Sequence, residues 1–263
     1  MQYLANPIAA LLHWCIGACN LYIARTKKSY MFGSYNFGTS FNVNRITVET
    51  YEDNGLYIYH RKSDPDIKKI ISAPTAIMVH PVEPVTQPKE ITHFLLIGLK
   101  KPILLSPRST ITYFVTFPVE IAIYASVNEQ IEHIDCFTLT HPKYTLYGTP
   151  TKGHICKGWK SDVYHTIPEV DAVREGVLKV TLHNVSNGWA ELKKIVVDAY
   201  YMKIFYSEFA SMNAVVTVLS KISAKTTFLD QPISTGMEKA VELFRLRKIP
   251  IVEKAEFTMR WGL

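Results

Sequence analysis

The pattern of apolar and polar residues along this chain is mostly that of β-strands. Ile46 and Val48 fall on one face of an extended segment, and Thr47 and Glu49 fall on the other. The same alternation returns in residues 176–182. Many such segments, separated by turn residues, predict a mainly β fold.

The strand-like segments fall into two groups, residues 31–140 and residues 177–263. Each group contains a strand, a polar turn and further strands that end in a similar apolar run, IAIY in the first and KIFY in the second. This weak repeat predicts two β-sandwich-like halves. Residues 141–176 are rich in Tyr, His, Gly and Pro and have neither the helical nor the strand period, so we predict an irregular strap that joins the halves.

One short helix is predicted near the C-terminus, over residues 236–248. Thr235 and Glu238 have the spacing of a capping box, and Pro250 ends the pattern. An apolar stripe at helical spacing predicts that this helix packs on a sheet. The stripe consists of Met237, Ala240, Val241 and Phe244.

Residues 1–30 differ from the rest, because residues 4–24 form an apolar run without a formal charge. One interpretation is an extension outside the fold, produced by a start assigned upstream of Met31. A second is a membrane anchor, since at about 1.5 Å per residue the run is just long enough to cross a bilayer. The basic residues after it would then keep the rest of the chain on the cytoplasmic side. A signal peptide or a packed helix is the third interpretation.

Composition and charge narrow the class of protein. Hydrophobic residues make up 48% of the chain and charged residues 20%, as in a globular protein. The formal net charge is +6, and it falls to +3 (26 basic against 23 acidic residues) without residues 1–30. A charge this small argues against nucleic acid as a partner. The four cysteines lack the dense spacing of a disulfide scaffold and indicate a reducing, cytoplasmic compartment, with Cys136 and Cys156 as one pair to test in the structure.

No nucleotide-binding or catalytic motif is present, and no cofactor is predicted. Two cysteines and two histidines near the strap supply the ligand types of a zinc site. Their spacing lacks the tight knuckles that orient such ligands, so packed thiols and hydrogen-bonded histidines are the favoured interpretation. The four residues are Cys136, His141, His154 and Cys156.

The strap also carries aromatic and polar residues of the kind that build sugar-binding and peptide-binding surfaces. The candidate ligand-binding residues are Trp159, Asp162, Tyr164 and His165. The same side chains serve equally to tie down a long connector, and this structural role is favoured. An acid–base pair of Asp162 with Glu169 is the weakest alternative, since nothing in the sequence defines their separation.

Several segments of residues 31–263 carry a family resemblance. They read PVEPVTQPKEITHFLLIGLKKPILLSPRSTITYFVTFPVEIAIY, PKYTLYGTPTKGHICKGWKSDVY, IPEVDAVREG and EFTMRWGL. Together they resemble an archaeal family of uncharacterised proteins, the domain of unknown function family numbered 432. The resemblance implies no known activity, cofactor or catalytic residue. It implies a start near Met31 and, through neighbouring ion-channel genes, a membrane channel or transporter as a partner.

Three functional hypotheses follow from these observations. The first is a non-catalytic binding or interaction module in the cytoplasm, accessory to a membrane channel or transporter. The second is a hydrolase or other enzyme that acts on a sugar or small metabolite under the 141–176 strap. The third is a membrane-anchored β protein that uses residues 4–24. An exposed apolar patch or a free sheet edge favours the first, and converging carboxylates or histidines in a cleft favour the second.

Overall fold

The computed structural model describes residues 31–128, 130–243 and 256–263. It confirms the mainly β fold: antiparallel pairing dominates, and the described residues contain one 3-10 turn, η1 (Ala199–Tyr201), in place of any longer helix. In these described parts of the chain, no helix has the length and apolar character that crossing a bilayer requires. The apolar run at residues 4–24 lies outside them.

Sheets A and B are antiparallel throughout and contain most of the early strands. Sheet A has the order β1-β6-β9-β10, with bounds β1 Gly33–Tyr35, β6 Ala76–Val82, β9 Glu120–Val127 and β10 Gln130–Phe137. Sheet B has the order β2-β3-β4-β5, with bounds β2 Ser40–Val43, β3 Ile46–Asp53, β4 Leu56–Lys62 and β5 Ile67–Ile71.

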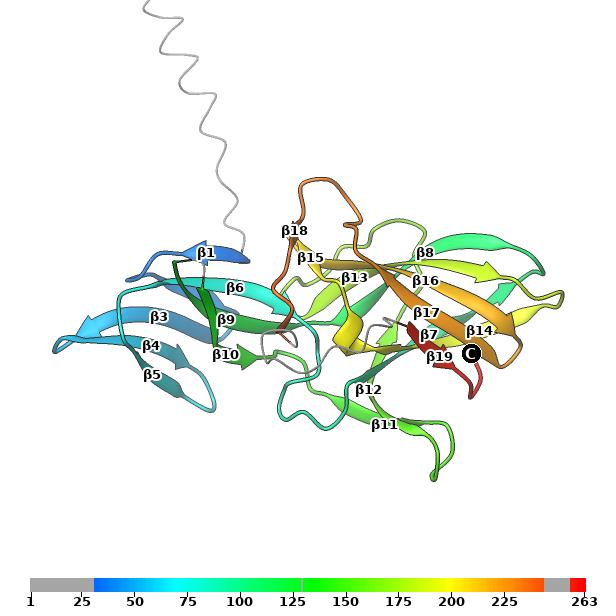
Figure 1. The fold of residues 1–263 in the computed structure, drawn as a ribbon, viewed down its shortest axis with the longest axis horizontal. Helices are drawn as coiled ribbons and strands as arrows, with labels where there is room; N and C mark the ends of the chain where they lie inside the picture. Colours follow the sequence, from blue (N-terminus) through cyan, green and yellow to red (C-terminus); the bar gives the residue numbers. More distant parts are fainter. Residues whose placement is uncertain (1–30, 129, 244–255) are drawn as a thin grey trace, which may run out of the picture. The chain divides into compact units, whose positions relative to one another are not determined.

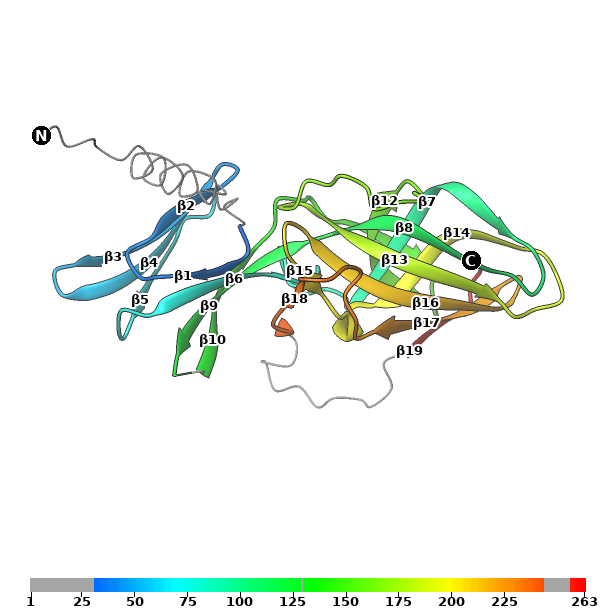
Figure 2. The same cartoon turned by 90° about the horizontal axis from the view of Figure 1, so that it is seen from above.

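Sheets C and D form a second pair of layers, with sheet D stacked on sheet C (Figure 1). Sheet C has the order β11-β12-β7-β14, with bounds β7 Phe94–Leu105, β11 Lys143–Tyr147, β12 His154–Ser161 and β14 Ala190–Asp198. Sheet D has the order β18-β15-β16-β13-β8, and β17 pairs with both β16 and β19. Its bounds are β8 Thr110–Pro118, β13 Glu175–Asn184, β15 Phe205–Tyr206, β16 Ala210–Ser220, β17 Ser223–Leu229, β18 Glu238–Lys239 and β19 Glu256–Met259. Strands β8, β13, β16 and β17 run side by side in Figure 2.

The boundary predicted at residue 140 does not separate the sheets. Strands β7 and β8 precede it, yet they pair with β12, β14 and β13, which follow it. The chain enters sheets C and D, returns to sheet A for β9 and β10, and then goes back. Such long-range pairing leaves no local sequence signal, because hydrophobic alternation does not say which strand is the neighbour.

The predicted irregular strap is in part regular. Residues 143–161 form the β11–β12 hairpin, and β12 also pairs in parallel with β7. Gly148 begins the turn with φ 108°, and a Cβ there would lie 2.8 Å from the Cα of Gly153. The turn therefore requires glycine at this position. After β12 the segment has little regular structure up to β13, as predicted for a strap.

The predicted helix over residues 236–248 is wrong over residues 236–242. Glu238–Lys239 form β18, which pairs with Phe205 and Tyr206 of β15. The amide of Ala240 then donates to the carbonyl of Ile204. Tertiary pairing overrides the local capping pattern here, and residues 244–248 lie outside the described residues.

A buried ion pair connects the two groups of sheets. The ammonium of Lys157 on β12 lies 2.7 Å from the Glu120 carboxylate at the start of β9, and the side chains are 5% and 1% exposed. Lys157 also donates to the carbonyl of Gln87, and the amides of Thr86 and Gln87 donate to Glu120. Burial raises the pKa of Glu120, and Lys157 and these two amides oppose that rise.

A second polar link joins sheet A to sheet D and the segment after β18. Nδ1 of His80 accepts a hydrogen bond from the amide of Val241, and Nε2 lies 3.2 Å from the hydroxyl of Tyr206. Tyr206 in turn donates to Glu238. The ring of Tyr124 packs edge-on against His80. Burial lowers the pKa of His80 to about 4, although the Glu238 charge opposes the shift.

The Lys157–Glu120 pair predicts a large asymmetry between single and double replacement. Lys157→Met leaves the Glu120 charge buried without its partner, so we expect a loss of about 3–5 kcal/mol in the free energy of unfolding. Adding Glu120→Gln to this variant removes that charge and should recover most of the lost free energy of unfolding. Urea denaturation at pH 7 measures both. Lys100→Met, which breaks the exposed pair with Asp162, is the control and should cost under about 1 kcal/mol. A Lys157→Met loss no greater than that of the control would contradict the role of the pair.

His80 predicts a specific pH dependence of stability. Its pKa falls from 6.5 to about 4 on folding, so the unfolded state binds more protons between these two values. The free energy of unfolding should therefore decrease as the pH falls through this window, by about 2 kcal/mol between pH 7 and pH 5. Urea denaturation at both pH values should show that His80→Gln lacks this component, whereas His165→Gln, at an exposed histidine, keeps it. Equal pH dependence in His80→Gln and the wild type would refute the assignment.

Candidate functional site

The outward face of sheet C carries a cluster of lysines around two glycines. In the strand register, Gly158 lies between Lys143 and Leu96, and Lys160 lies opposite Gly98. Directly paired residues share a face of a sheet, so these side chains point the same way. Lys194 on β14 is also opposite Gly98 and joins the same face.

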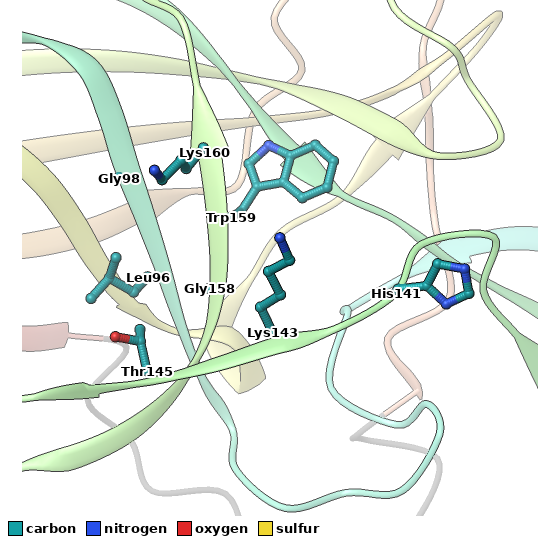
Figure 3. Close-up of a pocket in the computed structure, with 8 residues that line it drawn as sticks. All are labelled: Leu96, Gly98, His141, Lys143, Thr145, Gly158, Trp159 and Lys160. Carbon is teal, nitrogen blue, oxygen red and sulfur yellow. The ribbon is translucent and has the colours of Figure 1, made fainter.

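A groove of about 480 Å³ lies over this cluster. It is lined by Leu96, Gly98, His141, Lys143, Thr145, Gly158, Trp159 and Lys160 (Figure 3). Because the two glycines have no side chains, the centre of the floor stays open. A Cβ on Gly98 would make only ordinary contacts, the nearest at 3.6 Å, so steric crowding does not require glycine at this position.

The groove is cationic. Lys143 and Lys160 form no ion pair with any carboxylate of the described residues within 4.0 Å. Lys194 makes a cation–π contact, with its ammonium 5.3 Å from the centre of the Tyr147 ring. The sequence explains this excess of positive charge, since residues 136–161 contain four lysines and two histidines but no Asp or Glu. Of those lysines, Lys157 is neutralised by Glu120 on the opposite face of β12.

A smaller cavity of about 340 Å³ extends the basic character beyond the hairpin turn. Its lining combines cationic and aromatic side chains: Lys152, His154, Phe257, Thr258, Arg260 and Trp261. Among the described residues, no acidic side chain lines either cavity. This side of the molecule therefore attracts negative charge over an extended area.

Strand β11 is the outer strand of sheet C. Within the described residues it pairs with β12 alone. Tyr144 and Leu146 are exposed on the face opposite Lys143, together with Ile155 of β12. The site thus combines a basic groove, a sheet edge and a small apolar patch.

Comparison with known proteins gives a family but no activity. The family described as "Protein of unknown function (DUF432)" matches residues 31–261. The chain belongs to the DUF432 family. Comparisons with curated proteins and with solved structures gave no match.

The four ligand-binding residues predicted from the sequence of this DUF432 protein all have partners in the fold. The indole N–H of Trp159 donates to Thr116 of β8, which places the ring between sheets C and D. Lys100 donates to Asp162 at 2.7 Å. Tyr164 exchanges two backbone hydrogen bonds with Phe114, and the His165 ring lies 5.0 Å from that of Tyr113.

These contacts are those of a structural tie, which was the favoured interpretation. Asp162 and His165 are held by different strands of different sheets and do not converge on one cleft. Of the four residues, only Trp159 lines the groove. Ligand binding by the four therefore stays a prediction.

The structure does not bring the four predicted metal ligands together. No group of three or more His, Cys, Asp or Glu residues is placed to hold a metal in the described ranges. Cys136 and Cys156 are buried and form no disulfide within the described residues, and burial raises the pKa of Cys156 to about 12. His154 packs against the rings of Phe94 and Phe257, and His141 lines the groove. The buried Cys156 stays a neutral thiol at pH 7, which is a poor metal ligand.

Sequence reasoning missed the lysines and glycines of the groove. The run without acidic residues at 136–161 is visible in the sequence and signals a basic segment. The sequence alone could not assign Gly98 and Lys194 to the groove, because they join this face only through the register of β7 with β12 and β14.

Proposed function

We propose that this protein is a non-catalytic binding module that binds an acidic partner on the outward face of sheet C. The observation that carries the proposal is the basic groove, in which Lys143 and Lys160 flank an open glycine floor without a carboxylate partner in the described residues. Unpaired cations around a shallow groove favour anionic partners, because each contact replaces water without breaking an existing ion pair.

The exposed surroundings of the groove support a partner with an extended surface. Tyr144, Leu146 and Ile155 form an apolar patch on the opposite face of the same β11–β12 hairpin. Mixed apolar and charged character is typical of protein interfaces. The described residues that line the groove include no carboxylate that could serve as an acid or base, which favours binding over hydrolysis of a sugar.

Membrane channels and transporters are the partner class that we propose, because the family resemblance implies them. The module would then act from the cytoplasmic side, where such proteins expose acidic and basic loops. This assignment rests on the resemblance, whereas the acidic character of the partner rests on the groove.

Charge reversal tests the site. The double variant Lys143→Glu/Lys160→Glu should weaken binding of fluorescent poly-L-glutamate about tenfold, measured by anisotropy at low salt. Arg45→Glu/Lys221→Glu makes the same change in charge at exposed turn positions, in the β2–β3 and β16–β17 connections, and should bind almost as the wild type does. Used as baits in the native host, the wild type and the control should retain a partner that the groove variant loses. Equal loss in both double variants would show a diffuse charge effect and overturn the proposed site.

A further inference from the structure

The free edge of sheet C is strand β11, which lies next to the basic groove. We propose that an extended acidic segment of the partner protein adds to β11 as a fifth strand of sheet C. This inference rests on the proposed function and specifies how the partner binds. In strand addition, backbone hydrogen bonds supply affinity, and alternating side chains supply specificity.

Among the residues that the structure describes, no backbone group pairs with the outer side of β11. The hydroxyl of Thr92 donates to the carbonyl of Ile155, so the polar groups of Ile155 point toward β7 and away from β11. Ile155 is the cross-strand partner of Leu146, which makes this a non-hydrogen-bonded pair. The N–H and C=O groups of Leu146, and of Tyr144 two residues earlier, therefore face the free edge. They are the groups that an added strand would engage.

The two faces of β11 define the sequence pattern of that strand. Lys143 and Thr145 lie on the groove face, and Tyr144 and Leu146, which are 39% and 45% exposed, lie on the other. A neighbouring strand places its side chains alternately on the same two faces. Acidic residues at every second position would meet Lys143 and the groove. Apolar residues between them would cover Tyr144 and Leu146.

Charge also excludes the other occupants of this edge. Residues 1–30 contain no Asp or Glu, and residues 244–255 contain one acidic residue against four basic ones, so neither segment of this chain has the required pattern. A second copy pairing β11 with β11 would add its own Lys143 to the groove face of the sheet, which already carries Lys143 and Lys160. Added positive charge on that face opposes the pairing, and lysine on an edge strand is a common guard against self-association. Lys143 would instead attract the acidic side chains of an incoming partner strand.

A synthetic peptide of five Glu-Val repeats, labelled and used below the concentration at which it self-associates, is the probe. It should bind the full chain, and Lys143→Glu should weaken binding about tenfold, whereas the matched reversal Lys221→Glu should not. Leu146→Thr should weaken binding severalfold, and Leu219→Thr, at a similarly exposed strand position in sheet D, should have no effect. Leu146→Pro removes a donor that faces the free edge and spares the ladder with β12, so it should abolish binding and leave the fold intact by circular dichroism.

Two further peptides separate the inference from the proposed function. One has the same composition with all Glu before all Val, and the other carries N-methyl groups at every second residue. Both should bind far more weakly than the alternating peptide. If they bind equally well, the groove binds anions without strand addition, and this inference fails while the proposed function stands. If neither the alternating peptide nor poly-L-glutamate binds, both fail. Self-association of the chain that Leu146→Pro abolishes would make a second copy the occupant and would also overturn the inference.

Discussion

The buried ion pair between Lys157 and Glu120 joins sheet C to sheet A. It is almost fully buried and lies where β9, β12 and the connection after β6 meet. A buried pair of this kind contributes little as a net gain, yet losing one partner is costly. In this fold the pair fixes the position of β12, because it holds the inner face of that strand to the start of β9. The outer face of the same strand is the floor of the basic groove.

The groove follows from this arrangement through strand alternation. Lys157 points inward, so Gly158 and Lys160 both lie on the outward face, where together with Gly98 they form a surface of glycines and lysines. Parallel pairing with β7 makes β12 an internal strand and leaves β11 at the edge. The site is therefore built on strands rather than on a loose connection, and a partner would meet a rigid surface. One strand thus supplies the internal tie on one face and the candidate binding surface on the other.

The sequence was sufficient for the class of fold and insufficient for its pairing. Ile46 and Val48, or Leu178 and Val180, alternate clearly, and all four are buried in strands. In β12 the alternation is hidden, because its buried positions are held by Cys156, Lys157 and Ser161. The capping pattern at Thr235 and Glu238 is a local signal that the contact of β18 with β15 overrides. For the site, the basic run at 136–161 was readable, but its convergence with Gly98 and Lys194 depends on register between distant strands.

Amide hydrogen exchange at β11 is a direct test of whether an acidic strand adds to this edge. Tyr144 and Leu146 have amides that face the free edge, whereas those of Lys143 and Thr145 face β12. On addition of the alternating Glu-Val peptide, we expect exchange at Tyr144 and Leu146 to slow strongly and exchange at Lys143 and Thr145 to change little. Unchanged exchange at Tyr144 and Leu146 in a protein saturated with the peptide would contradict strand addition at this edge.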